Sequence, residues 1–264
     1  MATVLKLGGE LLEDATAVAA SAAAIVRLAR LEPLIVVHGG GRAIDADLKL
    51  RGLTPRFVDG LRVTDGAALD IVVSVLAGRT NTGLVAAVGA LGARAVGLTG
   101  ADAKIGLAVK AAPFATISGE HVDLGLVGEP GGGEVALLTD LLKLGYVPVI
   151  ASVGVAADGT LLNVNADVFA AYLAGAVGAR RLIVAGTTPG VLDGAGATIA
   201  ELTEADVQAL TASGTAHSGM VAKLNACRDA LRAGVSEVAI VAGRGVQDWD
   251  EAVGTRLVGA TSRV

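Results

Sequence analysis

Aromatic residues are scarce in this sequence, at 2% of 264 residues, although hydrophobic residues make up 53%. A core with so few rings has to be built from Ala, Val, Leu and Ile. These residues suit buried parallel strands that are covered by Ala-rich helices. A chain of this length can bury a sizeable core as one large domain or as two modest ones. The composition therefore favours an α/β protein with an open sheet.

Cysteine is nearly absent as well. Cys227 is the single one in the chain, which excludes an internal disulfide and fits a reducing compartment. The histidines, His38, His121 and His217, are far apart in the sequence and do not form a metal-binding motif. The N-terminus has no basic leader followed by a long apolar segment and a small-residue cleavage site. We therefore expect a cytoplasmic protein.

Clusters of positive charge and long apolar runs are also missing. The chain carries 21 basic and 26 acidic residues, a net charge of −5, and the basic residues are scattered. No electrostatic footprint for a nucleic acid is visible. Charged residues interrupt the apolar stretches, Asp14 and Arg27 around one and Lys143 and Asp158 around another, so each stretch is shorter than a membrane span requires. We expect neither a nucleic acid nor a membrane as a partner.

Short apolar runs alternate with Ala- and Leu-rich helical patterns that contain no proline. The expected strands cover residues 4–7, 34–37, 95–98, 147–151, 182–185 and 238–241. The expected helices cover residues 11–31, 43–50, 66–91, 134–144, 168–177 and 221–233. Such an alternation predicts a mostly parallel sheet with helices between its strands.

Two segments have a short, turn-rich pattern, residues 51–64 and 107–127. We expect the second to form a small antiparallel addition, which is a common way to build a substrate lid. Residues 125–134 contain a proline followed by three glycines and are expected to be flexible, although they are too few for a domain linker. A boundary between lobes, less marked than a domain linker, is expected near residues 154–159. It predicts two lobes, 1–154 and 155–264, that share one continuous sheet.

Glycine loops follow the first two expected strands, in Lys6-Leu7-Gly8-Gly9 and His38-Gly39-Gly40-Gly41. At the carboxyl ends of parallel strands, glycines let backbone N–H groups approach phosphate or carboxylate oxygens, and a following helix N-terminus favours anions. The usual nucleotide fingerprints are missing. The chain has no Gly-Lys dipeptide and hence no Walker A loop, and the spacing of Gly39, Gly41 and Ile44 does not match the dinucleotide turn. Protein-kinase signatures are absent too.

What remains is Lys6, at the end of the first strand, where an ammonium group could meet a transferring phosphoryl group. Taken alone, Lys6 is better explained as a lysine that extends from a strand end into solvent. His38, which precedes the second loop, is expected to orient the backbone there rather than to catalyse.

Five motifs decide between these interpretations. They are Lys6-Leu7-Gly8-Gly9, Val37-His38-Gly39-Gly40-Gly41, Gly60-Leu61-Arg62-Val63-Thr64-Asp65, Asn163-Val164-Asn165-Ala166-Asp167 and Gly219-Met220-Val221-Ala222-Lys223-Leu224-Asn225-Ala226. In this order, and over nearly its whole length, the sequence resembles the acetylglutamate kinase branch of the amino acid kinase family. The resemblance implies a three-layer αβα sandwich around an open, mainly parallel sheet, with a small β-hairpin lid.

The resemblance also implies a set of catalytic residues. Lys6 and Lys223 would neutralise charge on the phosphoryl group in flight, and Asp167 would hold the two lysines in place. Gly8 and Gly41 would donate backbone N–H groups to the phosphoryl group. This agrees with the chemistry, because a nucleophile that is already a carboxylate needs positive charge and alignment rather than a general base.

By the same resemblance, Arg62 and Asn163 would bind the α-carboxylate and acylamino end of the substrate, with Gly40 and Gly41 near its side-chain carboxylate. Arginine suits this task because its planar fork matches a carboxylate with two hydrogen bonds. From the residues alone, Arg62 is also compatible with a solvated hairpin position. Asn163 and Asp167 are likewise compatible with ordinary turn and helix N-cap positions.

ATP is expected in the C-terminal half. The nucleotide contacts that the resemblance implies come from Gly9, Gly186, Thr187, Gly190, Val191, Leu192 and Lys223. The sequence departs from the family here, because relatives commonly carry a Ser/Thr-Asp pair where this chain has Gly186-Thr187. Mg²⁺ would enter with the nucleotide, held mainly by phosphates and water, and no dedicated metal ligand is identified in the sequence.

The implied reaction is ATP-dependent phosphorylation of the γ-carboxylate of N-acetyl-L-glutamate to N-acetyl-L-glutamyl 5-phosphate, in arginine and ornithine biosynthesis. Two alternatives stay open: the same chemistry on N-succinylglutamate or a carrier-linked aminoadipate, and a non-catalytic nucleotide or amino-acid sensor. Thr187 mildly favours the sensor, whereas Lys6, Lys223 and Asp167 argue against it. Relatives inhibited by arginine usually carry an extra helix before the first strand, which here begins at Thr3. We expect a homodimer without strong arginine feedback.

Overall fold

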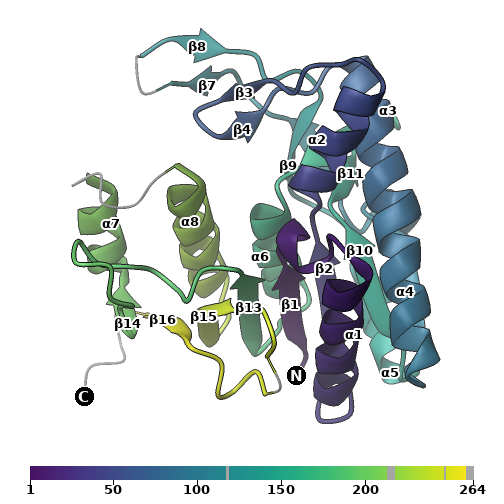
Figure 1. Cartoon of the computed structure of the whole chain (residues 1–264), viewed down its shortest axis with the longest axis vertical. Coiled ribbons are helices and arrows are strands. Elements are labelled where there is room, and N and C mark those ends of the chain that lie inside the picture. The colour runs from purple at the N-terminus through teal and green to yellow at the C-terminus, as the bar shows by residue number, and fades with distance from the viewer. Residues whose placement is uncertain (117–118, 213–217, 247, 260–264) are drawn as a thin grey trace.

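The computed structural model describes residues 1–116, 119–212, 218–246 and 248–259. Its centre is an eight-stranded sheet (Figure 1). In spatial order the strands are β14 (Glu201–Thr203), β16 (Gly254–Val258), β15 (Glu237–Ala242), β13 (Arg181–Gly186), β1 (Thr3–Leu7), β2 (Leu34–His38), β10 (Val147–Ala151) and β5 (Ala95–Thr99). The six strands from β15 to β5 are parallel, whereas β16 runs antiparallel to β15 and parallel to β14. All parallel strands therefore end at one edge of the sheet.

Helices cover both faces of this sheet. One face carries α5 (Ala136–Lys143), α6 (Ala166–Ala176), α7 (Glu204–Ala212) and α8 (Ser218–Arg232), and the other carries α1 (Ala15–Ala29) and α4 (Asn81–Ala90). Every residue of β1, β2 and β10 is buried, because both of their faces are covered, which is why these strands carry apolar residues on both faces rather than in alternation. The expected three-layer αβα sandwich with a mainly parallel sheet is confirmed.

The longest helical segment consists of α3 (Gly66–Val73), a π-helical turn (η2, Ser74–Thr80) and α4. Its 25 residues are long and apolar enough to cross a membrane by length and composition. Its apolar side chains are accounted for within the fold, however: Ile71 and Val72 pack in one buried cluster, and Leu84 and Val88 pack against the sheet in another. The segment therefore serves as a covering helix of the core.

The remaining strands form smaller structures beyond the carboxyl ends of the parallel strands (Figure 1). A four-stranded sheet has the order β11 (Val153–Val155), β12 (Leu161–Val164), β9 (Val127–Pro130) and β6 (Ala108–Lys110). Two hairpins, β3 (Phe57–Val58) with β4 (Leu61–Arg62) and β7 (Phe114–Ala115) with β8 (His121–Val122), project from the same end as α2 (Gly41–Leu50). The expected hairpin lid is therefore present.

Several details differ from the expectations. The first helix begins at Ala15 rather than Leu11, because Asp14 caps it by accepting a hydrogen bond from Ala17 N, and residues 9–11 form a short 3₁₀ turn (η1, Gly9–Leu11) instead. Residues 125–134, expected to be flexible, contain strand β9, which pairs with β6 and β12. The boundary predicted near residues 154–159 is not one of these differences: it falls in the β11–β12 hairpin, the central sheet takes strands from both sides of it, and the two lobes stay a prediction.

Candidate active site

A cavity of about 260 Å³ opens where β1 and β2 end, below the β3–β4 hairpin. Its position follows from the topology, because loops after parallel strands converge at one edge of the sheet. The residues that line it are Lys6, Gly8, Gly9, Glu10, Gly39, Gly40, Gly41, Ile44, Phe57, Gly60, Leu61, Arg62, Leu76, Val127, Ser152 and Asn163 to Asp167. Four of the five sequence motifs therefore contribute to one cavity.

Lys6, Asp167 and Lys223 meet beside this cavity. Lys6 Nζ lies 2.8 Å from Asp167 Oδ1, and Lys223 Nζ donates to both carboxylate oxygens of Asp167 at 3.1 Å. Asp167 is placed by the first turn of α6, where the side chain of Asn165 caps the helix by accepting from Asp167 N at 2.9 Å. The structure thus brings together residues from the first strand, α6 and α8.

The charges of these three groups shift one another's pKa values. Burial alone would raise the pKa of Asp167, but the ammonium groups of Lys6 and Lys223 outweigh it and lower that pKa to about 2. Burial likewise acts to lower the pKa of Lys6, yet attraction to Asp167 prevails and raises it. For Lys223, burial and the charge of Lys6 prevail and lower the pKa. Asp167 is therefore ionised at neutral pH, and the group is cationic while both lysines are protonated.

The two glycine loops pack against each other. A Cβ on Gly9 would lie 2.7 Å from Gly40 Cα, so a larger residue there would separate the loops, and a Cβ on Gly40 would lie 2.8 Å from Leu76 Cδ2 and displace that side chain. Gly41 is the first residue of α2. Within the described residues, the N–H groups of Gly9, Gly40 and Gly41 find no backbone acceptor. They are donors at a helix N-terminus or loop and are suited to an anion.

Gly8 differs from its neighbours. Its N–H donates to Ala185 O of β13 at 2.8 Å. The role that the resemblance implied for Gly8, as a backbone donor to the phosphoryl group, is therefore not available in this structure. The reason is that Gly8 still belongs to the hydrogen-bonding ladder between β1 and β13, which extends one residue beyond the strand.

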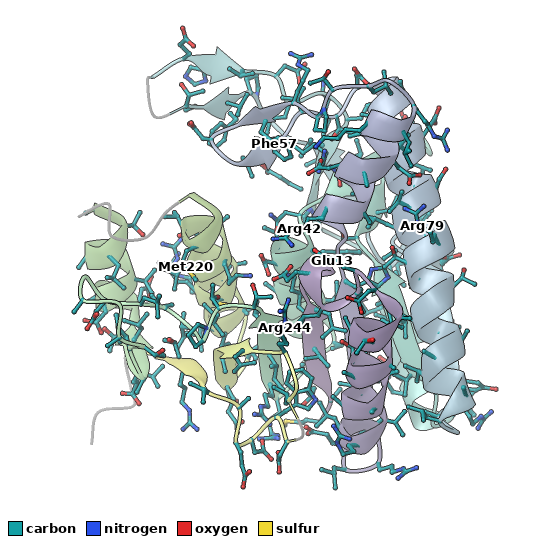
Figure 2. All side chains as sticks on the ribbon, in the orientation of Figure 1. Glu13, Arg42, Phe57, Arg79, Met220 and Arg244 are labelled. Atoms are coloured by element: carbon teal, nitrogen blue, oxygen red, sulfur yellow. The ribbon has the colours of Figure 1, made fainter. Side chains whose placement is uncertain are left out.

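Arg62 reaches into the cavity from β4 in a fixed orientation. Its Nη2 lies 2.7 Å from Asp45 Oδ1 and donates to Gly41 O at 3.2 Å. The guanidinium carbon lies 4.7 Å from the centre of the Phe57 ring. Phe57 is on β3, the other strand of the hairpin (Figure 2). Nη1 is buried and has no hydrogen-bond partner in the described part of the chain. One arm of the planar fork is therefore paired and the other is buried without a partner.

Asn163 lies on β12 and lines the same cavity. Its Nδ2 donates to Thr64 Oγ1 at 3.0 Å, which joins β12 to the segment that follows the β3–β4 hairpin. With Nδ2 used in this way, the amide oxygen is the group that Asn163 can offer as an acceptor. Asn163 and Arg62 thus offer an acceptor and a donor at the same end.

The expected nucleotide residues after β13 form a separate group that does not line the cavity. Gly190 has φ +105°, a conformation that only glycine adopts readily, and a Cβ there would lie 2.6 Å from Thr255 Oγ1. Val191 is buried and its N–H donates to Thr255 Oγ1 at 2.8 Å. Leu192 is half-exposed and forms an isolated bridge with Thr198. The loop is therefore anchored to β16 through Thr255.

The amino acid kinase family model matches residues 1–242 of the chain. This chain belongs to the amino acid kinase family. An acetylglutamate kinase from Sphingopyxis alaskensis is 42% identical over 248 residues, which cover 91% of this chain and 82% of that protein. An acetylglutamate kinase from Methanopyrus kandleri is 42% identical over 241 residues, covering 90% of this chain and 93% of that protein.

A solved structure shares the fold of this amino acid kinase family member. N-acetylglutamate synthase from Neisseria gonorrhoeae, complexed with coenzyme A and N-acetyl-glutamate, superimposes with a TM-score of 0.83 at 24% identity. The match covers 97% of this chain and 59% of the synthase, so the chain spans somewhat more than half of that protein's length. At this identity the likeness establishes the fold alone.

One site residue of this family member was not foreseen from its sequence. Glu10, in η1, lines the cavity, and its Oε1 accepts a hydrogen bond from Thr187 N at 3.3 Å. The only sequence signal was an acidic residue directly after the first glycine pair, and a single carboxylate in a turn carries no periodic pattern.

Two further polar residues of the family member are buried behind the second glycine loop. His38 Nε2 lies 3.0 Å from Asn81 Nδ2, which also donates to Val149 O at 2.9 Å, and His38 Nδ1 lies 3.3 Å from Gly39 O. Burial lowers the pKa of His38 to about 4, so the ring is neutral at neutral pH. Nε2 then accepts from Asn81 while the Nδ1 proton points to Gly39 O. This arrangement connects the glycine loop to β10 and α4.

Cys227 and His121 do not line the cavity. Cys227 is buried one turn beyond Lys223, and its thiol pKa is raised to about 12, chiefly by burial and also by Asp167. It is therefore not a thiolate nucleophile at neutral pH. His121 is exposed on β8, and His217 lies outside the described residues.

Proposed function

We propose that this chain is an ATP-dependent kinase that phosphorylates the γ-carboxylate of N-acetyl-L-glutamate to N-acetyl-L-glutamyl 5-phosphate, in arginine and ornithine biosynthesis. Acetylglutamate kinases that are 42% identical over about nine tenths of the chain support this function. The observation that carries it within the structure is the meeting of Lys6 and Lys223 on Asp167 beside two glycine loops.

In the proposed reaction, a γ-carboxylate oxygen attacks the γ-phosphorus of ATP, the bond from that phosphorus to the bridging oxygen breaks, and ADP leaves. The nucleophile is ionised at neutral pH, so no group has to remove a proton from it. The main obstacle is repulsion between two anions. We assign Lys6 and Lys223 to the neutralisation of the transferring group, with Asp167 as the residue that positions them.

The glycine loops supply neutral donors for the same group. We assign Gly41, as first implied, and Gly9, in place of Gly8, as N–H donors to phosphoryl oxygens. The support is that the N–H groups of Gly9 and Gly41 find no backbone acceptor in the described chain, whereas that of Gly8 is bonded to Ala185 O. Backbone donors of this kind need no reorganisation when charge develops, which makes them effective in transition-state stabilisation.

The amino acid is proposed to bind between Arg62 and the glycine loops. The buried and unpaired Nη1 of Arg62 supports a salt bridge to the α-carboxylate. Asn163, with its Nδ2 bonded to Thr64, would accept from the acylamino N–H. The γ-carboxylate would then lie near Gly40 and Gly41, on the side of Lys6. This pose leaves the acyl group facing the β3–β4 hairpin.

ATP use follows from membership of a kinase family, and we place the nucleotide on the C-terminal lobe, residues 155–264, with residues 1–154 serving substrate binding and dimerisation. The proposed nucleotide contacts are Gly9, Gly186, Thr187, Gly190, Val191, Leu192 and Lys223. In support, Gly186 and Thr187 end β13 next to β1, so phosphates bound there would point toward Lys6. Val191 N–H is bonded to Thr255, which leaves packing as the proposed contribution of Val191.

Mg²⁺ is proposed to accompany the nucleotide. Within the described residues, no group of three His, Cys, Asp or Glu side chains is placed to hold a metal ion. Mg²⁺ needs no such group, because it keeps several waters and binds through phosphates plus one or two carboxylates. Glu10, which lines the cavity beside Lys6, is a carboxylate of this kind. Bound Mg²⁺ would neutralise phosphate charge.

The proposed function is tested by trapping the product as a hydroxamate. Purified protein is incubated with ATP, Mg²⁺ and hydroxylamine, and with each of a panel of acids that includes N-acetyl-L-glutamate, N-succinyl-L-glutamate, N-acetyl-L-aspartate and N-acetyl-2-aminoadipate. We expect hydroxamate and ADP in equal amounts, with N-acetyl-L-glutamate as the preferred acid. Folded protein that yields hydroxamate with none of these acids would rule out the proposal.

The cellular setting belongs to the same proposal. We place the enzyme in the cytoplasm as a homodimer, which fits a single buried cysteine and a metabolic substrate. Analytical ultracentrifugation of the purified chain tests the dimer, since a monomer or a hexamer at assay concentrations would contradict it.

A further inference from the structure

Glu10 places a negative charge in the part of the site where the nucleotide phosphates are proposed to lie. Its side chain folds back over the first glycine loop instead of extending into solvent. A Cβ on Gly8 would lie 2.5 Å from Glu10 Oε1 and 2.6 Å from Oε2, and a Cβ on Gly186 would lie 3.1 Å from Oε1. The carboxylate therefore rests in a recess formed by two glycines, one after β1 and one at the end of β13.

The recess gives the carboxylate one hydrogen bond and one cationic neighbour. Glu10 Oε1 accepts from Thr187 N at 3.3 Å. Burial acts to lower the pKa of Lys6, whereas the charge of Asp167 and, to a smaller extent, that of Glu10 raise it. Among the described residues, no hydrogen-bond donor to Oε2 is found. One carboxylate oxygen of this cavity-lining side chain is held by the loop after β13, and the other has no donor among the described residues.

The other carboxylate that lines the cavity is already engaged. Asp167 is paired with Lys6 and Lys223. The acidic residues that line the cavity are Glu10 and Asp167. Because Asp167 is paired with both lysines, Glu10 is the lining carboxylate that has an oxygen to offer to a ligand.

A carboxylate beside a triphosphate requires a cation between them. Like charges at close range raise each other's energy unless a counter-charge intervenes, and the two lysines are already shared with Asp167. Mg²⁺ prefers carboxylate and phosphate oxygens together and needs few ligands from the protein. We infer that Glu10 is a protein ligand for the Mg²⁺ that accompanies the nucleotide. This inference rests on the proposed kinase function and identifies a metal-binding residue for it.

The test compares how strongly Mg²⁺ promotes nucleotide binding in wild type and Glu10→Gln. Glutamine keeps the shape and the hydrogen bond to Thr187 N but removes the charge. Isothermal titration calorimetry measures the Kd of ADP with Mg²⁺ and with EDTA, which is a readout independent of turnover. Mg²⁺ promotion of binding is the Kd with EDTA divided by the Kd with Mg²⁺. We expect this ratio to be at least about tenfold smaller in Glu10→Gln than in wild type, the scale for weakening a metal site.

Glu13→Gln is the matched control, because it removes the same charge three residues further along. Glu13 pairs with the exposed Arg42 at 3.2 Å and does not line the cavity (Figure 2). Its ratio should equal that of wild type. A second measurement uses Mn²⁺ in place of Mg²⁺ and follows free Mn²⁺ by electron paramagnetic resonance at saturating ADP. Weaker Mn²⁺ retention by Glu10→Gln than by Glu13→Gln is expected.

Two results would overturn the inference while leaving the kinase function intact. An unchanged ratio in Glu10→Gln would show that Glu10 does not bind the metal. Tighter ADP binding by Glu10→Gln to the same degree with Mg²⁺ and with EDTA would show that the carboxylate merely occupies the phosphate position. If wild type bound no ADP under either condition and gave no hydroxamate, the proposed function itself would fail, and this inference with it.

Discussion

Lys223 donates hydrogen bonds to both carboxylate oxygens of Asp167, each at 3.1 Å. Lys6 approaches the same carboxylate at 2.8 Å, so one acidic residue aligns two ammonium groups from β1 and α8. The three side chains are largely buried. Because a buried charge that loses its partner costs free energy, each of the three groups is held in place by the other two. The first prediction tests what the arrangement contributes to turnover.

Lys6→Met should lower kcat by about 10²- to 10³-fold, the scale for removing one preorganised charge-stabilising group. Methionine approximates the length of the buried lysine stem without its charge, and Lys223 still pairs with Asp167. Hydroxamate formation and urea unfolding are measured together, so a loss of turnover is separated from a loss of fold. Lys143→Met, at an exposed residue that pairs with Asp140, should keep wild-type turnover. Near-normal turnover of folded Lys6→Met would remove Lys6 from the mechanism.

The sequence was sufficient to predict the six parallel strands of the central sheet and the glycine loops, but not the edge strands β14 and β16. Leu34 to Val37 is continuously apolar and Val4 to Leu7 is interrupted by Lys6 alone, because both faces of these strands are covered, and this leaves a clear signal. The loops after them lie at one edge of the sheet for the same topological reason. By contrast, Lys6 and Lys223 are brought to Asp167 by tertiary packing, which local patterns do not specify, and only the family resemblance placed them together.

Other features left no usable signal. Glu10 is a single acidic residue in a turn, and its position over Gly8 depends on how β1 and β13 pair. The N–H of Gly8 was expected to be free, but the strand ladder extends to Ala185 O. Strand β9 lies next to three glycines in the sequence, and it forms because β6 and β12 offer pairing on both sides. In each case tertiary contacts override the local preference.

His38 predicts a pH dependence of stability. Burial lowers its folded-state pKa to about 4 from an ordinary 6.5. Between these values the unfolded chain binds a proton that the folded chain does not, so the free energy of unfolding decreases as pH falls from 6.5 to 4. The decrease attributable to His38 is about 3 kcal/mol. Urea unfolding at several pH values measures it.

The control for this prediction is a non-titrating residue at the same position. His38→Gln keeps an acceptor for Asn81 and should show a flatter dependence on pH than wild type. His121→Gln, at an exposed residue of β8, should follow wild type. Equal slopes for wild type and His38→Gln would contradict the assignment of a neutral, buried His38.

Arg62→Lys should raise the KM for N-acetyl-L-glutamate about 10- to 100-fold while changing the KM for ATP little, because a charge-assisted hydrogen bond contributes roughly 1.5–3 kcal/mol. Lysine cannot keep one arm of the side chain on Asp45 while offering another to a carboxylate. Arg79→Lys is a matched control. Arg79 pairs at 2.9 Å with Asp47, which is on α2 like Asp45, but Arg79 lies on the outer surface (Figure 2). Equal effects of the two variants on KM would contradict substrate binding by Arg62.

Gly190→Ala should destabilise the protein more than Gly196→Ala does. Both glycines have positive φ, +105° and +83°, so alanine is strained at either site by about 1–2 kcal/mol. A Cβ on Gly190 would also lie 2.6 Å from Thr255 Oγ1 and 2.8 Å from Thr255 N, whereas one on Gly196 would contact nothing within 4 Å. The added overpacking should cost about 1–3 kcal/mol more.

Urea unfolding of the two glycine variants isolates this contact, because the strain from φ is common to both. Gly190→Ala should also weaken ADP binding, since displacing Thr255 removes the acceptor for Val191 N–H and loosens the loop after β13. Gly196→Ala should bind ADP like wild type. Equal destabilisation by the two variants would mean that the loop absorbs the extra methyl group without moving Thr255, and nucleotide affinity would then be expected to stay unchanged in both.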